Sequence, residues 1–141
     1  MVRRLVLSLL VVSGLSLQGC GIEYQPGATV DVPSEWELDS LSEVSLSGIK
    51  VVPTLTFRDP SALHGNTGCN LYFGDYSLNG TALEPGQLAT TKAGCPNKHG
   101  VAVERRLLRV YELTRSHAIT TDGDLVLLNE NEVVLARFKP L

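Results

Sequence analysis

Two cysteines and two histidines in the middle of the chain are the residues best suited to chemistry. Four residues separate His64 from Cys69, 25 separate Cys69 from Cys95, and three separate Cys95 from His99. A thiolate beside an imidazole can act as a nucleophile, and four such side chains can hold zinc. These spacings match no standard zinc pattern, and the Cys-x-x-Cys spacing of redox enzymes is missing. We therefore predict no metal site, no cofactor and no catalytic residue, and expect a disulfide between Cys69 and Cys95 if the protein is exported.

The first 20 residues indicate export. Arg3 and Arg4 precede an apolar run over residues 5–12, and Leu17-Gln18-Gly19-Cys20 closes it. A basic start, a short apolar stretch and a small residue before the cut are typical of a secretory signal peptide. The run is too short for the ~20 residues that span a bilayer. The Leu-x-Gly-Cys ending resembles a bacterial lipobox, in which the cysteine thiol is diacylated and becomes the first mature residue.

This resemblance implies a lipoprotein with its signal peptide over residues 1–19 and its lipid attachment at Cys20. Two or more acyl chains, such as palmitate, hold a protein durably to a membrane, whereas one chain holds it only marginally. Gly21 stands where an Asp tends to retain enteric lipoproteins in the inner membrane, so the resemblance favours the outer membrane, facing the periplasm. The alternative is an ordinary signal peptide that ends by chance in a cysteine.

An oxidising periplasm makes the Cys69–Cys95 disulfide the default interpretation. Closing a loop of about 27 residues stabilises a fold by roughly 3–4 kcal/mol in the chain-entropy description. The rival interpretation, two free thiols, would reopen a Cys69 nucleophile with His64 or His99 as its base.

Size and charge limit the number of domains and the kinds of partner that the protein can have. Removing residues 1–19 from the 141 leaves 122, enough for one domain, with ten basic and fifteen acidic residues and a net charge of −5. No basic patch is evident, so we expect no nucleic-acid partner. The oligomeric state is left open by the sequence.

The pattern of elements predicts a mainly β (α+β) fold, a small antiparallel β-barrel or roll with one α-helix. We expect a lipidated N-terminus and tether over residues 20–34 and the domain over residues 35–141. Val103, Leu107, Val110 and Tyr111 share one face of the predicted helix at residues 101–113. Strands are expected at residues 36–38, 54–57, 72–78, 81–83, 88–91, 125–128 and 133–138, with 117–120 as a weaker candidate.

Three local features add to this pattern, and the last two leave a choice open. Asn79-Gly80 predicts a hairpin with a type I′ turn. Tyr72 and Tyr76 share one face of their strand and Phe73 takes the other, so one face packs in the core and the other could present aromatic surface. The basic helix residues could meet lipid phosphates, although a solvated face is favoured; they are Arg105, Arg106 and Arg109.

The motifs together resemble the META domain, or HslJ-like, family of envelope proteins. They are Trp36-x-Leu38, Pro53-Thr54-Leu55-Thr56-Phe57, Gly65-x-x-Gly68-Cys69-Asn70-x-Tyr72-x-Gly74-x-Tyr76, Leu88-Ala89-Thr90-Thr91-x-x-x-Cys95, Glu104-x-x-Leu107-Leu108, Leu125-x-Leu127 and Leu135-x-x-Phe138. The resemblance spans residues 36–138 and implies a structural role for Gly68, Cys69 and Asn70. Lys92, Ala93, Gly94 and His64 depart from the family pattern.

The family brings no established catalytic residues and is associated with heat shock and drug tolerance. The resemblance therefore implies a non-enzymatic, membrane-anchored binding module in envelope homeostasis or stress tolerance, with a periplasmic protein as a possible partner. Two alternatives remain, an inhibitor of a lysozyme-type enzyme and a carrier of a small apolar ligand.

Overall fold

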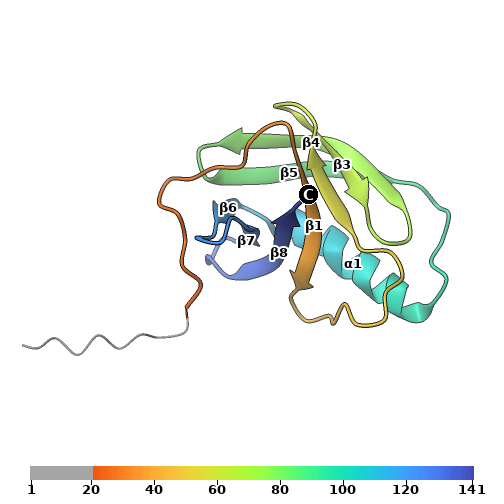
Figure 1. Cartoon of the computed structure of the whole chain (residues 1–141). Coiled ribbons are helices and arrows are strands. Elements are labelled where there is room, and N and C mark those ends of the chain that lie inside the picture. The colour runs from red at the N-terminus through yellow and green to blue at the C-terminus, as the bar shows by residue number, and fades with distance from the viewer. Residues whose placement is uncertain (1–20) are drawn as a thin grey trace, which may run out of the picture.

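The computed structural model describes residues 21–141 and contains eight antiparallel strands and one helix (Figure 1). The predicted signal peptide and Cys20 lie outside the described residues. The elements are β1 (Ser34–Leu41), β2 (Thr54–Phe57), β3 (Ala62–Asn66), β4 (Leu71–Asn79), β5 (Ala82–Thr90), α1 (Lys98–Leu113), β6 (Ser116–Ile119), β7 (Leu125–Leu128) and β8 (Val134–Pro140).

Each strand pairs with the next, and β8 pairs with β1, so the sheet closes into a barrel-like ring. This confirms the predicted α+β fold. The contact between β5 and β6 is the shortest, with one paired position, Ala82 opposite Ser116. The helix α1 connects these two strands and packs on β5 and on the β1–β8 side of the ring.

The apolar face of α1 was predicted correctly. Val103, Leu107, Val110 and Tyr111 are its buried residues. The helix begins at Lys98, three residues before the predicted start, because the Asn97 side chain accepts a hydrogen bond from the Gly100 N–H at 2.7 Å. Such capping satisfies a backbone donor that has no partner within the helix.

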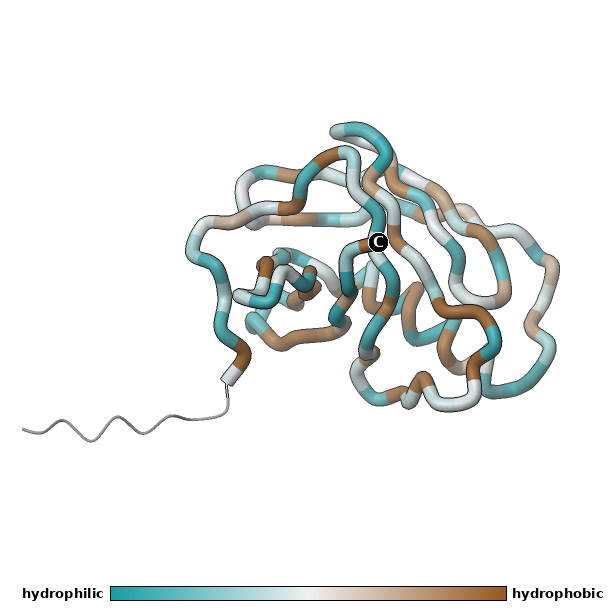
Figure 2. Tube along the Cα trace, in the orientation of Figure 1, coloured by the Kyte–Doolittle hydropathy of each residue, from teal (hydrophilic) through white to brown (hydrophobic). Residues whose placement is uncertain are grey.

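Side chains fill the interior of the ring. On β4, one face of the strand contributes to this core and the other points outward. Tyr72 and Tyr76 are buried, whereas Phe73 points outward and is 57% exposed. The Tyr72 hydroxyl donates to the Thr54 carbonyl at 2.7 Å, so the Tyr111 hydroxyl, 2.6 Å away, must donate to Tyr72. Hydrophobic and hydrophilic residues follow one another at short intervals along the strands (Figure 2).

The hairpin between β4 and β5 is confirmed, but its turn is not the predicted one. Asn79 pairs with Ala82, so the two turn residues are Gly80 and Thr81. Gly80 has a φ of 57°, and Asn79 and Thr81 have no positive φ. A positive φ at the first central position alone is typical of a type II′ turn, which places glycine first.

The structure also corrects the predicted tether, because much of the segment before β1 is bonded to the ring. Tyr24 bridges to Thr120, and the Gln25 N–H donates to the Ile119 carbonyl at 2.8 Å. Val30 is buried in the core with 4% of its surface exposed. Figure 1 shows this segment running along the β6–β7 side before it reaches β1. Its glycines and prolines suggested a spacer, but its apolar side chains extend the core.

Candidate functional site

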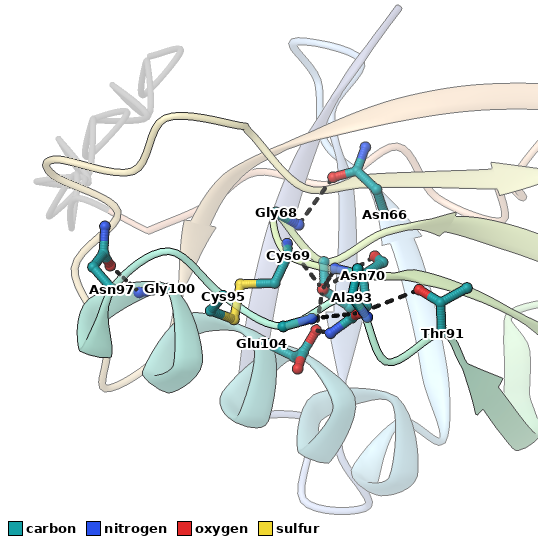
Figure 3. Close-up of a disulfide and its surroundings, with 12 residues drawn as sticks. Asn66, Gly68, Cys69, Asn70, Thr91, Ala93, Cys95, Asn97, Gly100 and Glu104 are labelled. Atoms are coloured by element: carbon teal, nitrogen blue, oxygen red, sulfur yellow. Dashed lines mark hydrogen bonds between the residues drawn. A yellow bond between two sulfur atoms is a disulfide. The ribbon is translucent and has the colours of Figure 1, made fainter.

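Four of the residues singled out in the sequence, Gly68, Cys69, Asn70 and Cys95, lie together where the β3–β4 turn meets the start of α1 (Figure 3). Cys69 and Cys95 form the predicted disulfide, with their Cα atoms 4.7 Å apart. Neither sulfur is then a thiolate, so the nucleophile and thiolate-ligand interpretations need prior reduction. The two histidines do not join this cluster: His64 is exposed on β3, and His99 lies in the first turn of α1.

The turn that carries Cys69 depends on Gly68. β3, which was not among the predicted strands, extends to Asn66, and the turn that follows spans residues 67–70. Gly68 has a φ of +91°, and a Cβ there would lie 2.9 Å from the Val51 carbonyl oxygen. A side chain at this position would therefore meet both backbone strain and a steric clash.

Asn70 joins the turn to the segment after β5. Its Oδ1 accepts hydrogen bonds from the Ala93 N–H at 2.7 Å, the Gly94 N–H at 3.4 Å and the Thr91 hydroxyl at 3.2 Å. Its Nδ2 donates to the Glu104 carboxylate on α1 at 2.8 Å. One buried amide therefore connects three parts of the fold beside the disulfide.

Glu104 is a member of this cluster that the sequence did not assign to it. Its Oε2 accepts from Asn70 and from the hydroxyl of Thr67, which is fully buried. Glu104 lies within 4.8 Å of both disulfide sulfurs, but its hydrogen bonds serve the turn. Helical spacing placed Glu104 off the apolar face of α1, so the pattern carried no signal for this contact.

A surface pocket of about 230 Å³ lies beside the disulfide. Lys50 is the one residue with a titratable side chain among those that line it, because Cys69 is held in the disulfide. General acid–base catalysis needs a proton donor or acceptor with a suitable pKa, usually oriented by a second group. The lining of this pocket offers no such pair. The remaining lining residues are Ile49, Val51, Thr67, Gly68, Cys69, Gly94, Pro96, Asn97, Gly100 and Val103.

Two of the three arginines of α1, Arg106 and Arg109, form contacts within the protein. Arg106 donates to the backbone oxygen and hydroxyl of Ser42 and forms an ion pair with Glu43 at 3.0 Å. Arg109 pairs with Glu112 at 2.6 Å on the surface. These contacts favour the predicted solvated face over a phosphate-binding face.

A second buried polar contact, which no local sequence pattern indicates, holds the N-terminal segment to β6. The ring of His117 is 1% exposed. Its Nε2 accepts from the Val30 N–H at 2.9 Å, so its Nδ1, 3.1 Å from the Thr81 carbonyl oxygen, carries the proton and donates. Burial lowers the pKa of His117, since the charged form loses its hydration.

Acidification is expected to destabilise the protein through His117. Because the pKa is lowered by folding, the unfolded chain binds more protons, and stability present above the unfolded pKa of about 6.5 is lost as the pH falls. The loss reaches at most about 1.4 kcal/mol per pH unit. Urea unfolding of wild type and His117→Gln at neutral pH and at pH near 5 measures it, and the variant should show a smaller pH dependence.

His64→Gln is the matched control for this measurement, because His64 is exposed on the outer face of β3. Tyr24 and Glu132 are the other titratable residues that line the surface pocket beside His117. Both are unchanged in every variant, so their contribution cancels when the proteins are compared at the same two pH values. Equal pH dependence in wild type and His117→Gln would contradict the assignment.

Fold and site together define a small α+β domain in which a disulfide and a buried amide brace one turn against the helix. A model of the META domain family matches residues 29–140. The chain belongs to that family. The match begins within the segment that was predicted to be a tether, which agrees with the burial of Val30.

Solved structures share this fold. A protein from Burkholderia xenovorans, determined by NMR, superposes with a TM-score of 0.61 at 20% identity, over 85% of this chain and 99% of that one. Another NMR structure gives a TM-score of 0.58 at 19% identity, over 74% of this chain and 86% of the other. No curated protein matches the chain in sequence. Within residues 21–141, no helix has the length and apolar character needed to cross a bilayer.

Proposed function

We propose that this protein is a non-enzymatic lipoprotein of the bacterial outer membrane that binds a periplasmic partner in envelope homeostasis or stress tolerance. The META domain supports an envelope-associated role for the family and is not known as an enzyme family. The filled interior of the ring is the observation that supports a surface partner over an internal ligand. Phe57, Tyr72 and Tyr111 occupy the space where a small barrel would hold a ligand. Binding is therefore assigned to the outer surface.

The N-terminal segment supports a close anchor. The Thr121 N–H donates to the Glu23 carbonyl at 3.0 Å, only three residues after Cys20. Three extended residues span roughly 10 Å. A lipid on Cys20 would therefore hold the turn between β6 and β7 near the membrane surface.

Intact mass of the protein extracted from its native membrane tests the anchor. We expect a chain that begins at Cys20 and carries acyl chains. Cys20→Ala is expected to leave the protein without them and to move it out of the membrane fraction, since the lipid is the proposed source of membrane affinity. Ser8→Ala, inside the predicted signal peptide, is the matched control and should remain lipidated. An unacylated wild-type protein would contradict the proposal.

A second candidate, inhibition of a lysozyme-type enzyme, is favoured by the charge of the sheet. Strands β1 to β5 carry five acidic residues and no Lys or Arg, and opposite charge steers a basic enzyme toward such a surface. Lysozyme activity measured with the purified protein at low salt separates the two functions, because unchanged turnover would reject inhibition. The apolar carrier is disfavoured, because a ligand inside the ring would have to displace the core.

A further inference from the structure

The second half of β5 is an open edge of the sheet. β5 pairs with β4 along its length, whereas β6 pairs with β5 at one position, Ala82. Within residues 21–141, no strand pairs with residues 88–90 on the side away from β4. Ala89 and Thr90 are exposed, so another polypeptide can reach this edge.

Thr91 shows which backbone groups of this edge lack a partner. Its N–H donates to the Leu71 carbonyl at 2.9 Å, so the backbone of Thr91 faces β4. Successive residues of an antiparallel strand address opposite edges, so Ala89 also faces β4, and Leu88 and Thr90 face away from it. Among the described residues, none forms a hydrogen bond with the outward N–H or C=O groups of these two. Two donors and two acceptors therefore remain free at the spacing of a β-ladder.

The features that usually protect an edge strand end before these residues. Proline, charged side chains and coverage by another element keep a free edge from pairing with a further chain. Glu84 and Pro85 lie in the first half of β5, close to the pairing with β6. Residues 88–90 are Leu-Ala-Thr, with neither a charge nor a proline. The edge is therefore unprotected where its backbone groups are free.

A groove lies between this edge and α1. Its volume is about 450 Å³, and Leu108 and Tyr111 line it from the helix. Leu88 and Thr90 line it from β5, since residues two apart project to the same side of a strand. In Figure 1, β4 lies above β5 and α1 lies below it. A single strand added to β5 would therefore have its backbone on the sheet edge and alternate side chains against the helix.

Two exposed cations lie at one end of this groove. α1 runs antiparallel to β5, because Ser116, which follows the helix, pairs with Ala82 at the start of β5. Lys92 comes directly after the open edge, and Arg105 lies about one helical turn before Leu108, toward the same end. Within the part of the chain that the structure describes, neither cation forms an ion pair.

No unpaired acid lines the groove. Glu112 lines its other end and is paired with Arg109 at 2.6 Å. Asp75 and Glu84 are exposed on the neighbouring strands β4 and β5, and neither lines the groove. The charges therefore favour a segment whose own negative charge lies at the Lys92 end.

We propose that β5 and α1 bind an extended segment of a partner protein, which adds a strand antiparallel to β5. The segment has apolar side chains opposite Leu88 and Thr90, and these enter the groove. An acidic residue two positions earlier in the segment lies opposite Lys92. This inference rests on the proposed binding function and names the surface and the partner chemistry. In such strand addition, main-chain hydrogen bonds give affinity and pockets for alternate side chains give specificity.

The position of α1 disfavours a second copy of this chain as the occupant. A copy that paired its own β5 here would carry its β4 and β3 toward the helix, whereas one extended segment needs only the groove. A purely apolar ligand is disfavoured as well, because it would cover free N–H and C=O groups without offering them partners.

Binding of a short synthetic peptide tests the proposal. The probe is fluorescent Asp-Thr-Val-Thr-Val-Thr with blocked termini, titrated with the full-length protein in an uncharged detergent, and empty micelles are the blank. We expect saturable binding. Methylating the backbone nitrogens of both valines should weaken it at least about tenfold, because those N–H groups face β5. Methylating the threonine nitrogen between them is the matched control and should change the affinity less than about twofold.

Absence of saturable binding would overturn the proposal. An equal loss on methylating either set of nitrogens would overturn strand pairing as the mode of binding.

Protein variants locate the site. Thr90→Pro removes one outward N–H and is expected to weaken binding at least about tenfold, whereas the matched control Thr90→Val keeps that N–H and the affinity. Lys92→Glu with Arg105→Glu should weaken binding of the Asp peptide and strengthen binding of a peptide with Lys in its place. Circular dichroism and thermal unfolding show whether each variant is folded, and the charge reversal tests the site independently of Thr90→Pro.

The outcome for this groove is separable from that for the proposed function. Peptide binding that is unchanged in the folded Thr90→Pro and charge-reversed variants would overturn this site and leave a partner on another surface. A dimer of the protein that the peptide dissociates would show that a second copy occupies the edge, and would overturn the assignment to a partner protein.

Discussion

Replacing Cys69 and Cys95 together by serine is expected to lower the free energy of unfolding by about 3.5 kcal/mol. The disulfide joins residues 26 apart in sequence and encloses the whole β4–β5 hairpin. Without the bond, the unfolded chain regains the conformational entropy of that loop. For a domain of this size the loss corresponds to a fall in Tm of about 14 °C.

Thermal unfolding of the non-lipidated Cys20→Ala protein, with and without the two serines, measures this effect. A reductant should lower the Tm of the protein that has the disulfide and leave that of the serine variant unchanged. Thiol alkylation provides an independent check, because Cys69 and Cys95 should react only after reduction. A serine variant as stable as its parent would show that the disulfide does not stabilise the folded protein.

Periodic elements were the part of the fold that the sequence predicted well. The four buried residues of α1 repeat at helical spacing, so their common face is visible without the structure. Every strand except β3 was also expected from a short run bounded by turn residues, and β5 was expected as two runs, 81–83 and 88–91. Both signals are local, because each depends on residues only a few positions apart.

Contacts between distant residues explain what the sequence did not predict. Val30 and His117 are 87 residues apart, and Asn70 and Glu104 are 34 apart. No local period relates the members of either pair. The Gly68-Cys69-Asn70 motif was predicted to be structural through its resemblance to the META family, but its partner on the helix was not. Composition likewise suggested a tether before β1, because Pro and Gly outweighed the apolar signal of Val30.

The buried contact between Asn70 and Glu104 explains why the turn needs more than the disulfide. The disulfide fixes Cys69 to Cys95 covalently, but the N–H groups of Ala93 and Gly94 still need an acceptor near the helix start. Asn70 is 8% exposed, so water has little access to its side chain, whereas Ala93 and Gly94 are exposed and water can replace their acceptor in part. A buried donor that loses its partner costs about 1–3 kcal/mol.

Asn70→Ala is therefore expected to lower the free energy of unfolding by about 3 kcal/mol, because two backbone donors and the Glu104 carboxylate lose a partner at once. Thr91→Val is the matched control. It removes one of the three bonds to Asn70 Oδ1 and an exposed bond from the Leu71 N–H, leaves the Glu104 contact in place, and should cost about 1 kcal/mol or less. Urea unfolding at neutral pH measures both variants.

Asn70→Asp separates the electrostatic part of this contact from its shape. The new carboxylate keeps an oxygen for the Ala93 N–H but places a second negative charge beside Glu104, where Asn70 Nδ2 had donated. Two carboxylates that share a site disfavour each other's ionised form. At neutral pH we expect Asp to be at least as destabilising as Ala, and at pH near 5 we expect Asp to recover relative to Ala as one proton is taken up. Parallel pH dependence of the two variants would show that Glu104 does not sense the charge at position 70.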